Sequence, residues 1–458
     1  MNIIIVGDGK VGSTLTSQLA KEGHQVVVID NQSSVLKKAV DRDDVLVVEG
    51  NGATMQILRE ASAEKADLII AATSADEVNI LSCLVAKKLG CKHTIARVRN
   101  PEYASQLEFM KEELGLSMSV NPELAAAQEI ARIVSYPSAL KIDSFLRGRV
   151  ELIEIKLEAG NPLINKSLFE LPSAFKVKVL VCAIKRGSEI LIPKGNVVLQ
   201  EGDKITITGS IRDINEFFKA IGIAKRRIRS AMLVGGGKVA YYLTKRLTES
   251  GIYVKIIEKN PERCRFLCEN LPRAVIVEGD GTDRDLLIEE GLEKMDAFIS
   301  LTDMDEENVI ISMYASHSGV NKVITKVNRI PYLDLLEKMG IDTVISPKNI
   351  IAAQIVRFVR AMANAENTTL ESLYRIVDNQ VEALEFSVPN CKNYLHKPLK
   401  DLPLRNNLLL ASIYRRGAVI HPSGLDVLEP GDHVIVVTTE EGLQDISDIF
   451  ARGSGYEL

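Results

Sequence analysis

The chain contains the same long pattern twice, and this duplication constrains its fold more than any other feature. The chain has 458 residues. An early segment reads IIIVGDGKVGSTLTSQLAKEGHQVVVID, and a later one reads AMLVGGGKVAYYLTKRLTESGIYVKIIE. Equivalent positions keep an offset of 228 residues, as from 7 to 235; the pairs are Gly7 and Gly235, Gly9 and Gly237, Lys10 and Lys238, and Asp30 and Glu258. Because this period is far longer than a solenoid repeat, each copy must contain its own core.

The similarity of the two copies continues well beyond these segments. VVEGNGATMQIL corresponds to IVEGDGTDRDLL, AATSADEVNI to SLTDMDEENVI, and ARVRNPEY to TKVNRIPY. Further on, SVNPELAAAQEIARIV corresponds to VISPKNIIAAQIVRFV, and IKRGSEILIPKGNVVLQEGDKITITG to IYRRGAVIHPSGLDVLEPGDHVIVVT. Chance does not produce self-similarity of this length, so we expect both copies to share one fold.

Short apolar runs alternate with helical segments over about the first 135 residues of a copy. In the first copy the runs are IIIVG, QVVVID, VLVVEG, DLIIAAT, HTIARV and SMSV. Buried strands of a parallel sheet read as continuous Val, Ile and Leu runs because helices cover both faces. The alternation therefore predicts a doubly wound α/β sheet, of the parallel Rossmann type, in each copy.

A capping residue before a proline marks the end of each sheet, at Asn121-Pro122 and at Ser346-Pro347, and predicts a helix start there. Strand-rich stretches of about 80 residues with glycine and proline turns follow and predict a small α+β module. The expected domains are a Rossmann domain at 1–138, a small domain at 139–224, a basic linker KRRIR at 225–229, a second Rossmann domain at 230–366 and a second small domain at 367–458. We interpret the linker as solvated, with contact to an acidic partner or a membrane surface as the alternative.

The charge balance and the apolar pattern exclude several classes of protein. The formal net charge is −5, from 56 basic and 61 acidic residues, whereas a protein that grips phosphate backbones is usually basic. No run approaches the roughly 18–20 continuous apolar residues of a membrane span. The start, MNIIIVGDGK, lacks the basic segment of a signal peptide. We therefore expect a cytoplasmic protein that does not bind nucleic acid.

The six cysteines form no CxxC pair and no Cys/His cluster at metal-ligand spacing, so the sequence predicts no metal site. Cys264 and Cys268 stand four apart on an expected helix and should share one face. We interpret them as two buried small side chains, with a redox pair or half of a metal site as the alternative.

The glycine turn of the first copy is typical of nucleotide binding. The residues are Gly7, Asp8, Gly9, Lys10, Val11 and Gly12, which directly follow an apolar strand and open a helix. The first glycine permits a tight turn, the second lets the backbone approach a pyrophosphate, and the third lets helix and strand pack closely. The helix amino terminus offers unpaired N–H groups and a positive dipole end to the phosphates.

An acid follows the glycine turn at the spacing expected for a ribose contact. Asp30 ends the next strand, 23 positions beyond Gly7 and close to the expected spacing of about 20. Its carboxylate can accept both hydroxyls of an adenosine ribose, which also disfavours a 2′-phosphate. The alternative is a tight strand–helix turn that has lost its ligand.

The second copy has the same glycine turn and following acid, with small changes. Its turn is Gly235, Gly236, Gly237, Lys238 and Val239, with Ala240 at the third glycine position. Glu258 takes the place of the acid at the same spacing, and Lys259 beside it makes exclusion of a 2′-phosphate less secure. The lysines inside the two turns are placed to reach a phosphate, or else project into solvent.

These features together resemble the TrkA family, whose members carry two domains of the RCK or KTN type, and the resemblance covers nearly the whole chain. It lies in the paired glycine turns, the EGNG and EGDG segments, and the RG…P.G…L..GD module that closes each copy. The resemblance implies Rossmann domains that bind NAD or NADH, or ATP or ADP, and closing modules that pair between subunits. It also implies a homo-oligomeric ring, a tetramer of two-unit chains, on the inner face of the cell membrane beneath a Trk-type potassium transporter whose activity it changes.

The resemblance adds further site residues by position. The first site would be completed by Asn51, Thr73, Ser74 and Arg97, and the second by Asp280, Thr302, Asp303 and Lys326. Asn51 departs from the aspartate usual in the family, which Asp280 retains. Lys326 replaces a bidentate arginine with a point charge. These departures leave open that the two copies prefer different nucleotides.

We favour a regulatory protein that is not an enzyme and acts by population shift, in which a ligand favours one arrangement of the ring. The alternative of an NAD-dependent oxidoreductase needs a proton donor near the nicotinamide. Tyr241 and Lys245 have the spacing of such a pair, but they stand on the expected phosphate-binding helix. A redox-sensing transcription factor would need a DNA-binding module and a basic patch, which the sequence does not show.

Overall fold

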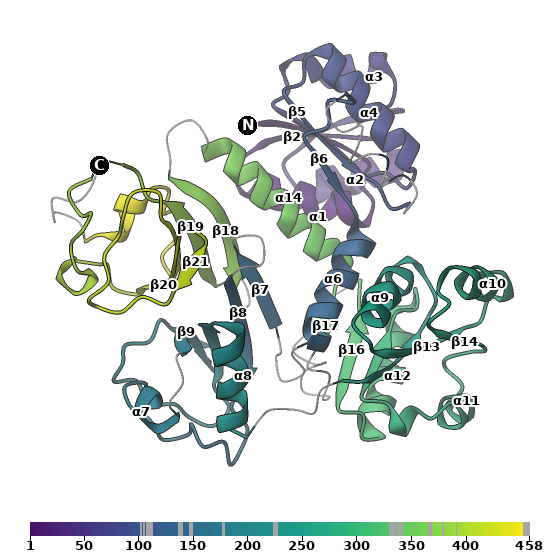
Figure 1. Cartoon of the computed structure of the whole chain (residues 1–458). Coiled ribbons are helices and arrows are strands. Elements are labelled where there is room, and N and C mark those ends of the chain that lie inside the picture. Colours follow the sequence, from purple (N-terminus) through teal and green to yellow (C-terminus); the bar gives the residue numbers. More distant parts are fainter. Residues whose placement is uncertain are drawn as a thin grey trace. The chain divides into compact units, whose positions relative to one another are not determined.

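Two compact units make up the structure, and each takes one part from each copy (Figure 1). The computed structural model describes residues 1–451 except 101–102, 104–105, 107–112, 136–140, 146–149, 176–178, 223–227, 329–335, 337–340, 342, 365–368, 378–379 and 391. Unit 1 consists of Met1–Ala131 and Ile228–Val356, and unit 2 of Arg132–Arg227 and Arg357–Leu458. Most of the basic linker lies outside the described residues, and the predicted domain boundaries stay predictions.

Unit 1 contains one Rossmann sheet from each copy. The first copy supplies β1 (Asn2–Val6), α1 (Lys10–Lys21), β2 (Gln25–Asp30), α2 (Ser33–Arg42), β3 (Leu46–Glu49), α3 (Met55–Glu60), the 3-10 helix η1 (Ala63–Lys65), β4 (Leu68–Ala71), α4 (Asp76–Leu89), β5 (His93–Arg97), β6 (Met118–Val120) and α6 (Pro122–Ser135). The second copy supplies β12 (Ser230–Val234), α9 (Lys238–Glu249), β13 (Tyr253–Glu258), α10 (Pro261–Asn270), β14 (Val275–Glu278), α11 (Arg284–Glu289), η3 (Leu292–Lys294), β15 (Ala297–Ser300), α12 (Asp305–His317), β16 (Lys322–Lys326), β17 (Val344–Ile345) and α14 (Pro347–Asn364). The helices α6 and α14 continue into unit 2.

Both sheets of unit 1 have six parallel strands in one topology. The orders are β3-β2-β1-β4-β5-β6 and β14-β13-β12-β15-β16-β17. Ile3, Ile4 and Ile5 of the central strand β1 are at most 1% exposed, because helices cover both faces of the sheet. The predicted doubly wound fold is therefore confirmed, with a topological switch point between β1 and β4 and again between β12 and β15.

Unit 2 contains two smaller antiparallel sheets. The first copy supplies β7 (Lys141–Phe145), β8 (Val150–Lys156), α7 (Leu171–Phe175), β9 (Val179–Arg186), β10 (Glu189–Leu191), β11 (Lys204–Gly209) and α8 (Ile211–Ala220). The second copy supplies β18 (Leu370–Ile376), β19 (Val381–Ser387), η4 (Leu399–Asp401), β20 (Leu408–Arg415), β21 (Ala418–Ile420), β22 (His433–Thr438) and η5 (Ile446–Ile449). The strand orders are β10-β9-β11-β8-β7 and β18-β19-β22-β20-β21, and this confirms the predicted α+β modules.

The arginine of the closing motif forms an ion pair with the buried aspartate of the motif in each copy. Arg186 donates from Nε and Nη2 to the carboxylate of Asp203, both at 2.8 Å. Arg415 donates to Asp432 in the same bidentate way, at 2.8 and 2.7 Å. The motif therefore fixes the hairpin of β9 and β10, or β20 and β21, against the neighbouring strand.

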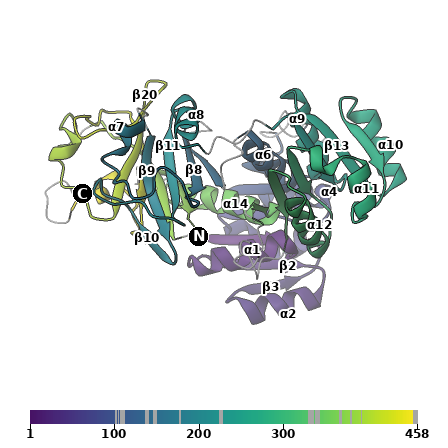
Figure 2. The ribbon, with the colours of Figure 1, turned by 90° about the horizontal axis from the view of Figure 1, so that it is seen from below.

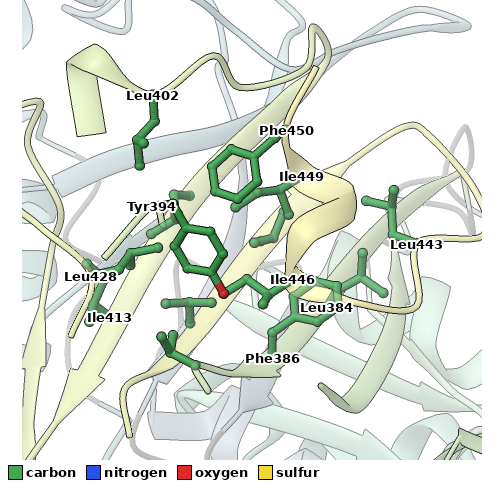
Figure 3. Packing of buried hydrophobic residues seen from close by; sticks show 14 of the residues in the cluster. Leu384, Phe386, Tyr394, Leu402, Ile413, Leu428, Leu443, Ile446, Ile449 and Phe450 are labelled. Carbon is green, nitrogen blue, oxygen red and sulfur yellow. The ribbon is translucent and has the colours of Figure 1, made fainter. Parts of the chain in front are cut away.

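The two sheets of unit 2 share one apolar core. Phe145 and Ala183 of the first copy belong to the same buried cluster as Ala383 and Val437 of the second. The rings of Phe145 and Tyr374 lie 4.1 Å apart between centroids, and Figure 2 shows the strands of both modules side by side. Each module also has a core of its own; Figure 3 shows that of the second copy around Tyr394.

The cysteines that the structure describes are free thiols. Cys264 is buried, and its Sγ donates to the carbonyl of Glu258 at 3.2 Å. Cys268 is exposed, so the prediction of two buried side chains is wrong for this residue. It lies one turn further along α10, on an exposed part of the helix. None of the described helices combines the length and the apolar character needed to cross a bilayer.

Candidate nucleotide-binding sites

A glycine turn lies at the switch point of each Rossmann sheet. Gly7 and Gly235 have φ of +91° and +95°, a conformation that favours glycine. A Cβ on Gly7 would come within 3.0 Å of Thr73, and one on Gly235 within 2.9 Å of the Thr302 nitrogen. The structure therefore brings each predicted turn against the predicted threonine that follows β4 or β15.

The second glycine of each turn faces open space. Gly9 and Gly237 have φ of −67° and −64°, which any residue adopts, and an added Cβ would meet nothing within 4 Å. Neither the backbone φ nor the packing of the described residues requires glycine at these positions. A ligand close to the backbone would require it, as expected for a bound pyrophosphate.

The third position of the turn differs between the copies. A Cβ on Gly12 would lie 1.8 Å from the carbonyl oxygen of Gly7, so the first copy requires glycine there. The second copy has the buried Ala240 at this position. The two turns therefore differ in whether this position carries a methyl group.

The helices that follow the glycine turns have no capping side chain. Neither α1 nor α9 receives a side-chain hydrogen bond at its N-cap, and neither has an acid in its first turn. By contrast, Asn260 caps α10 and Asp283 caps α11. Because the first amides of a helix lack intrahelical partners, α1 and α9 present donors and a positive dipole end to an anion. Lys10 and Lys238 are exposed at these ends, whereas Val11 and Val239 are buried.

The predicted acid closes the glycine turn in both copies. Asp30 accepts from the backbone N–H of Asp8 at 2.9 Å and from that of Gln32 at 3.0 Å. Glu258 accepts from the N–H of Gly236 at 2.6 Å and from that of Asn260 at 2.8 Å. Each carboxylate oxygen keeps further acceptor capacity for a ribose hydroxyl. The acids thus lie beside the turns, where the ribose prediction needs them.

The side chain of Asp8 faces the protein interior. It is 6% exposed, and its carboxylate accepts from the Thr16 hydroxyl at 2.9 Å and from Arg42 at 3.3 Å. Burial raises the pKa of Asp8, against the opposing effects of Thr16 and Arg42. Of the predicted contacts at this residue, only the backbone can serve a ligand. The second copy has Gly236 here, where a Cβ would come within 2.6 Å of Leu267.

The predicted Asn51 and Asp280 lie exposed in matching loops. Asn51 accepts from the N–H of Ala53 at 3.0 Å. Asp280 accepts from the N–H and the hydroxyl of Thr282 at 2.9 and 2.8 Å, and the backbone bond lowers the pKa of Asp280.

The second glycine of each EGNG or EGDG segment holds its loop against the central strand. A Cβ on Gly52 would lie 2.3 Å from Val6, and one on Gly281 would lie 2.1 Å from Val234. The segments are thereby kept at the carboxyl ends of β1 and β12. We interpret these glycines as packing residues rather than as ligand contacts.

A buried asparagine fixes the threonine loop in each copy. Asn79 accepts from the N–H and the hydroxyl of Thr73 at 2.8 and 2.7 Å and donates to the Arg97 carbonyl at 2.9 Å. Asn308 accepts from Thr302 at 2.9 and 2.8 Å and donates to the Lys326 carbonyl at 3.0 Å. The sequence analysis did not single out these asparagines, although both lie in the repeated segments ADEVN and MDEEN.

Arg97, the last residue of β5, is a nearly unpaired cation in the first site. The Nη2 of Arg97 lies 4.0 Å from Glu123, and its Nε has no hydrogen-bond partner among the described residues. Burial lowers the pKa of Arg97. A largely buried guanidinium in this state can bind an anion. The nearby Ser74 is exposed, and its carbonyl accepts from the guanidinium of Arg99.

The corresponding cation of the second site, Lys326, already has a hydrogen-bond partner and an ion-pair partner. Lys326 donates from Nζ to the Leu301 carbonyl at 3.2 Å and lies 3.3 Å from the exposed carboxylate of Asp303. The two sites therefore differ at this position in charge pairing as well as in residue type.

Arg263 is a residue of the second site that the sequence analysis missed. Its Nε donates to the Gly236 carbonyl at 2.6 Å, and its guanidinium lies 4.5 Å above the ring of Phe266. Burial lowers the pKa of Arg263, and the charge of Glu258 opposes this shift. The first copy has Val35 at the equivalent position, so the comparison of the two copies did not indicate a site residue here.

One group of side chains in unit 2 has metal-ligand spacing among the described residues. The Nδ1 of His433 lies 3.0 Å from Glu371 and 3.8 Å from Glu385, and Ser372 donates to Glu385 at 2.7 Å. The first copy has Lys204 at the position of His433. The set of possible ligands is therefore not repeated in the first copy, and we assign no metal to this group.

Comparison with known families covers most of the chain. The TrkA-N domain matches residues 3–122 and again 231–347. The TrkA-C domain matches residues 152–222 and 383–451. Both sheets of unit 1 thus fall in one domain type and both small modules in the other.

Similar proteins of known name extend over the full length. The Trk system potassium uptake protein TrkA homolog of Archaeoglobus fulgidus is 34% identical and covers 98% of this chain and 100% of its own. The Trk system potassium uptake protein TrkA of Halomonas elongata is 33% identical and covers 99% of each chain.

Among solved structures, the GsuK channel bound to NAD aligns with a TM-score of 0.62 at 18% identity, over 96% of this chain and 77% of the channel chain. The GsuK RCK domain aligns with a TM-score of 0.61 at 18% identity, over 96% of this chain and 92% of that one. At this identity the structural likeness establishes the fold.

Proposed function

The chain belongs to the TrkA family of potassium uptake proteins, and from this premise we propose that it is a regulatory subunit of a potassium transport system that senses adenine nucleotides. The sensing sites are the two glycine turns of unit 1. The observation that carries this proposal is the open space at Gly9 and Gly237, since no contact among the described residues requires glycine there.

The geometry of each pocket supports a nucleotide with an unmodified ribose. The uncapped amides of α1 and α9 would bind the phosphates, and Asp30 and Glu258 would accept the ribose hydroxyls. NAD or NADH fits this arrangement, and ATP or ADP would use its adenosine half. The GsuK channel, which shares the fold, is described as bound to NAD.

The remaining predicted residues would line the two pockets from the later strands. In the first pocket these are Asn51, Thr73, Ser74 and Arg97, and in the second Asp280, Thr302, Asp303 and Lys326. The largely buried Arg97 would bind phosphate or the distal half of a dinucleotide. Lys326 would first have to leave Asp303, so we expect the two pockets to differ in affinity.

Regulation would operate through a shift between two arrangements of a homo-oligomer, as a tetramer of two-unit chains on the inner face of the membrane. The partner would be an integral membrane potassium transporter of the Trk type. A nucleotide that binds one arrangement more tightly biases the oligomer and, through it, the transporter.

An oxidoreductase fits the structure less well. Tyr241, the candidate proton donor, lies on α9, where its ring packs 5.6 Å from that of Tyr242 and 5.9 Å from that of Phe266. A donor must instead face the nicotinamide, at the far end of a bound dinucleotide. We therefore propose a binding protein without catalytic activity.

Titration calorimetry with NAD, NADH, ATP and ADP tests the proposal on the full chain. We expect Asp30→Ala to remove binding at the first pocket and Glu258→Ala at the second, each leaving the other pocket occupied. Asp41→Ala and Glu269→Ala replace exposed acids on α2 and α10 and serve as matched controls. Folded protein that gives no heat with any of the four nucleotides would refute nucleotide sensing, and steady NADH oxidation with a carbonyl substrate would favour the enzyme.

A further inference from the structure

The hydroxyl of Tyr242 joins the two Rossmann domains of unit 1. Tyr242 lies on α9 of the second copy, whereas both its partners belong to the first copy. The side-chain amide of Asn121 donates to the Tyr242 hydroxyl at 3.1 Å, and that hydroxyl donates to the Arg99 carbonyl at 3.2 Å. Figures 1 and 2 both show α6, which begins directly after Asn121, alongside α9.

The direction of each hydrogen bond in this link is fixed. The Oδ1 of Asn121 accepts from the N–H of Leu124 at the start of α6, so Nδ2 must face the hydroxyl. The hydroxyl proton is then available only for the Arg99 carbonyl. Burial raises the pKa of the Tyr242 phenol, which keeps this proton in place.

One partner of Tyr242, Arg99, also contacts residues of the first pocket. The N–H of Arg99 donates to the buried carboxylate of Asp76 at 2.8 Å, and the Arg99 guanidinium donates to the carbonyl of Ser74. Ser74 and Arg97 are residues of the proposed first pocket. A ligand that displaces them therefore displaces the acceptor of the Tyr242 hydroxyl.

Tyr242 itself lies on α9, the helix whose amino terminus would bind the phosphates in the second pocket. Gly237, the N-cap of α9, precedes Tyr242 by only five positions on the same helix. Ala240 and Leu243, on either side of the tyrosine pair, are fully buried and bind the helix to its own sheet. Because a short helix moves as a rigid rod, a shift of its amino terminus shifts the Tyr242 hydroxyl.

The first copy has no equivalent of this link among the described residues. Thr14 stands at the position of Tyr242, and its hydroxyl donates to the backbone carbonyl of Lys10 in its own helix at 3.0 Å. Ser346 stands at the position of Asn121, and its hydroxyl oxygen has no partner in the described part of the chain. Within one chain this link therefore connects Arg99, beside the first pocket, to α9, the helix that begins at the second pocket.

We propose that Tyr242 couples the two nucleotide pockets, so that occupancy of either one changes the affinity of the other. This inference rests on the proposed function, since it requires that both pockets bind. By linkage the coupling is reciprocal: each ligand changes the affinity of the other pocket by the same factor.

Titration calorimetry on the full chain, with NAD as the probe, or ADP where NAD gives no heat, measures this coupling. The Asp30→Ala variant reports the second pocket with the first one empty, and the unmodified chain reports it with the first one filled. We expect the two dissociation constants to differ by at least about fivefold. In a Tyr242→Phe background the difference should fall to within about twofold, while each single-pocket affinity stays nearly unchanged.

Tyr241→Phe is the matched control, because it removes a neighbouring hydroxyl that has no hydrogen-bond partner in the described chain. It should keep the coupling of the unmodified protein. Equal dissociation constants in the unmodified chain, or coupling that survives Tyr242→Phe, would overturn the inference while leaving nucleotide sensing intact. Absence of heat in both single-pocket variants would instead remove the proposed function and, with it, the coupling.

Discussion

Glycines serve three different purposes within the two turns. Gly7 adopts a positive φ, Gly12 leaves no room for a methyl group, and Gly9 faces open space. Substitutions at these positions should therefore separate folding from binding. Of the three, only Gly9 would be required by a bound ligand rather than by the fold, under the proposed function.

We predict that Gly9→Ala weakens nucleotide binding at the first pocket by about tenfold or more without loss of stability. Its φ of −67° suits alanine, which restricts the unfolded chain and adds up to about 1 kcal/mol to the free energy of unfolding. Gly12→Ala should instead cost about 1–3 kcal/mol or more, because its Cβ would overlap the Gly7 carbonyl. Urea denaturation and calorimetry of both variants test this. Unchanged affinity in Gly9→Ala would place the phosphates elsewhere.

Tyr394 in the second small module presents a different residue-scale case. Its side chain is fully buried, and its hydroxyl has no partner among the described residues (Figure 3). Burial raises the pKa of this phenol far above its ordinary range, so it stays neutral.

We predict that Tyr394→Phe raises the free energy of unfolding by about 1 kcal/mol, since a buried polar group without a hydrogen bond is removed. The ring stays in contact with Phe450, whose centroid lies 4.9 Å away, so no cavity opens. Chemical denaturation of the full chain measures the change. A lower stability would mean that the hydroxyl is hydrogen-bonded in solution.

Most helices and strands could be predicted from local sequence. The six apolar runs of the first copy all became strands, because buried parallel strands need continuous apolar residues. Asn121 and Pro122 marked the start of α6, since capping and ring geometry act within one turn. Side chains such as Asn79, Arg263 and Tyr242 could not be found this way, because their partners are set by packing between elements far apart in the chain.

The residue after the hairpin of β20 and β21 is partly buried and differs from its counterpart in the first copy. His421 follows β21 where the first copy has Ile192. Burial lowers the pKa of His421, and the charge of Asp213 opposes this shift. The Nδ1 of His421 has no hydrogen-bond partner in the described part of unit 2.

This burial predicts a pH dependence of stability. The unfolded chain takes up a proton at the ordinary pKa of about 6.5, whereas the folded chain takes it up only at lower pH. The unfolded state therefore binds more protons below about pH 6.5, and the stability of unit 2 should fall as the pH falls through that value. In His421→Ile, which copies the first module, this part of the loss should vanish. Urea midpoints at about pH 5.5 and 7.5 compare the two proteins, and equal pH slopes would contradict the prediction.

At the scale of the molecule, both proposed pockets lie in unit 1, whereas unit 2 holds the shared core of the small modules. A ligand stabilises only the folded region that binds it. The division into two units therefore predicts a selective response to nucleotide.

We expect differential scanning calorimetry to resolve two transitions. Nucleotide at about one hundred times its dissociation constant should stabilise unit 1 by about 2.7 kcal/mol for each pocket that it fills and leave unit 2 unchanged. A variant carrying both Asp30→Ala and Glu258→Ala should lose this shift. A single transition that moves as a whole would show that the units unfold together.

The shared core of unit 2 also bears on how such a chain can evolve. Phe145 and Ala183 of one copy are covered by Ala383 and Val437 of the other, so a half-length product would expose an apolar sheet face. Fission of the gene would succeed only if the separated halves found each other again. Because folding holds the copies together, the two proposed pockets can differ in sequence within one chain, as they do at Val35 and Arg263.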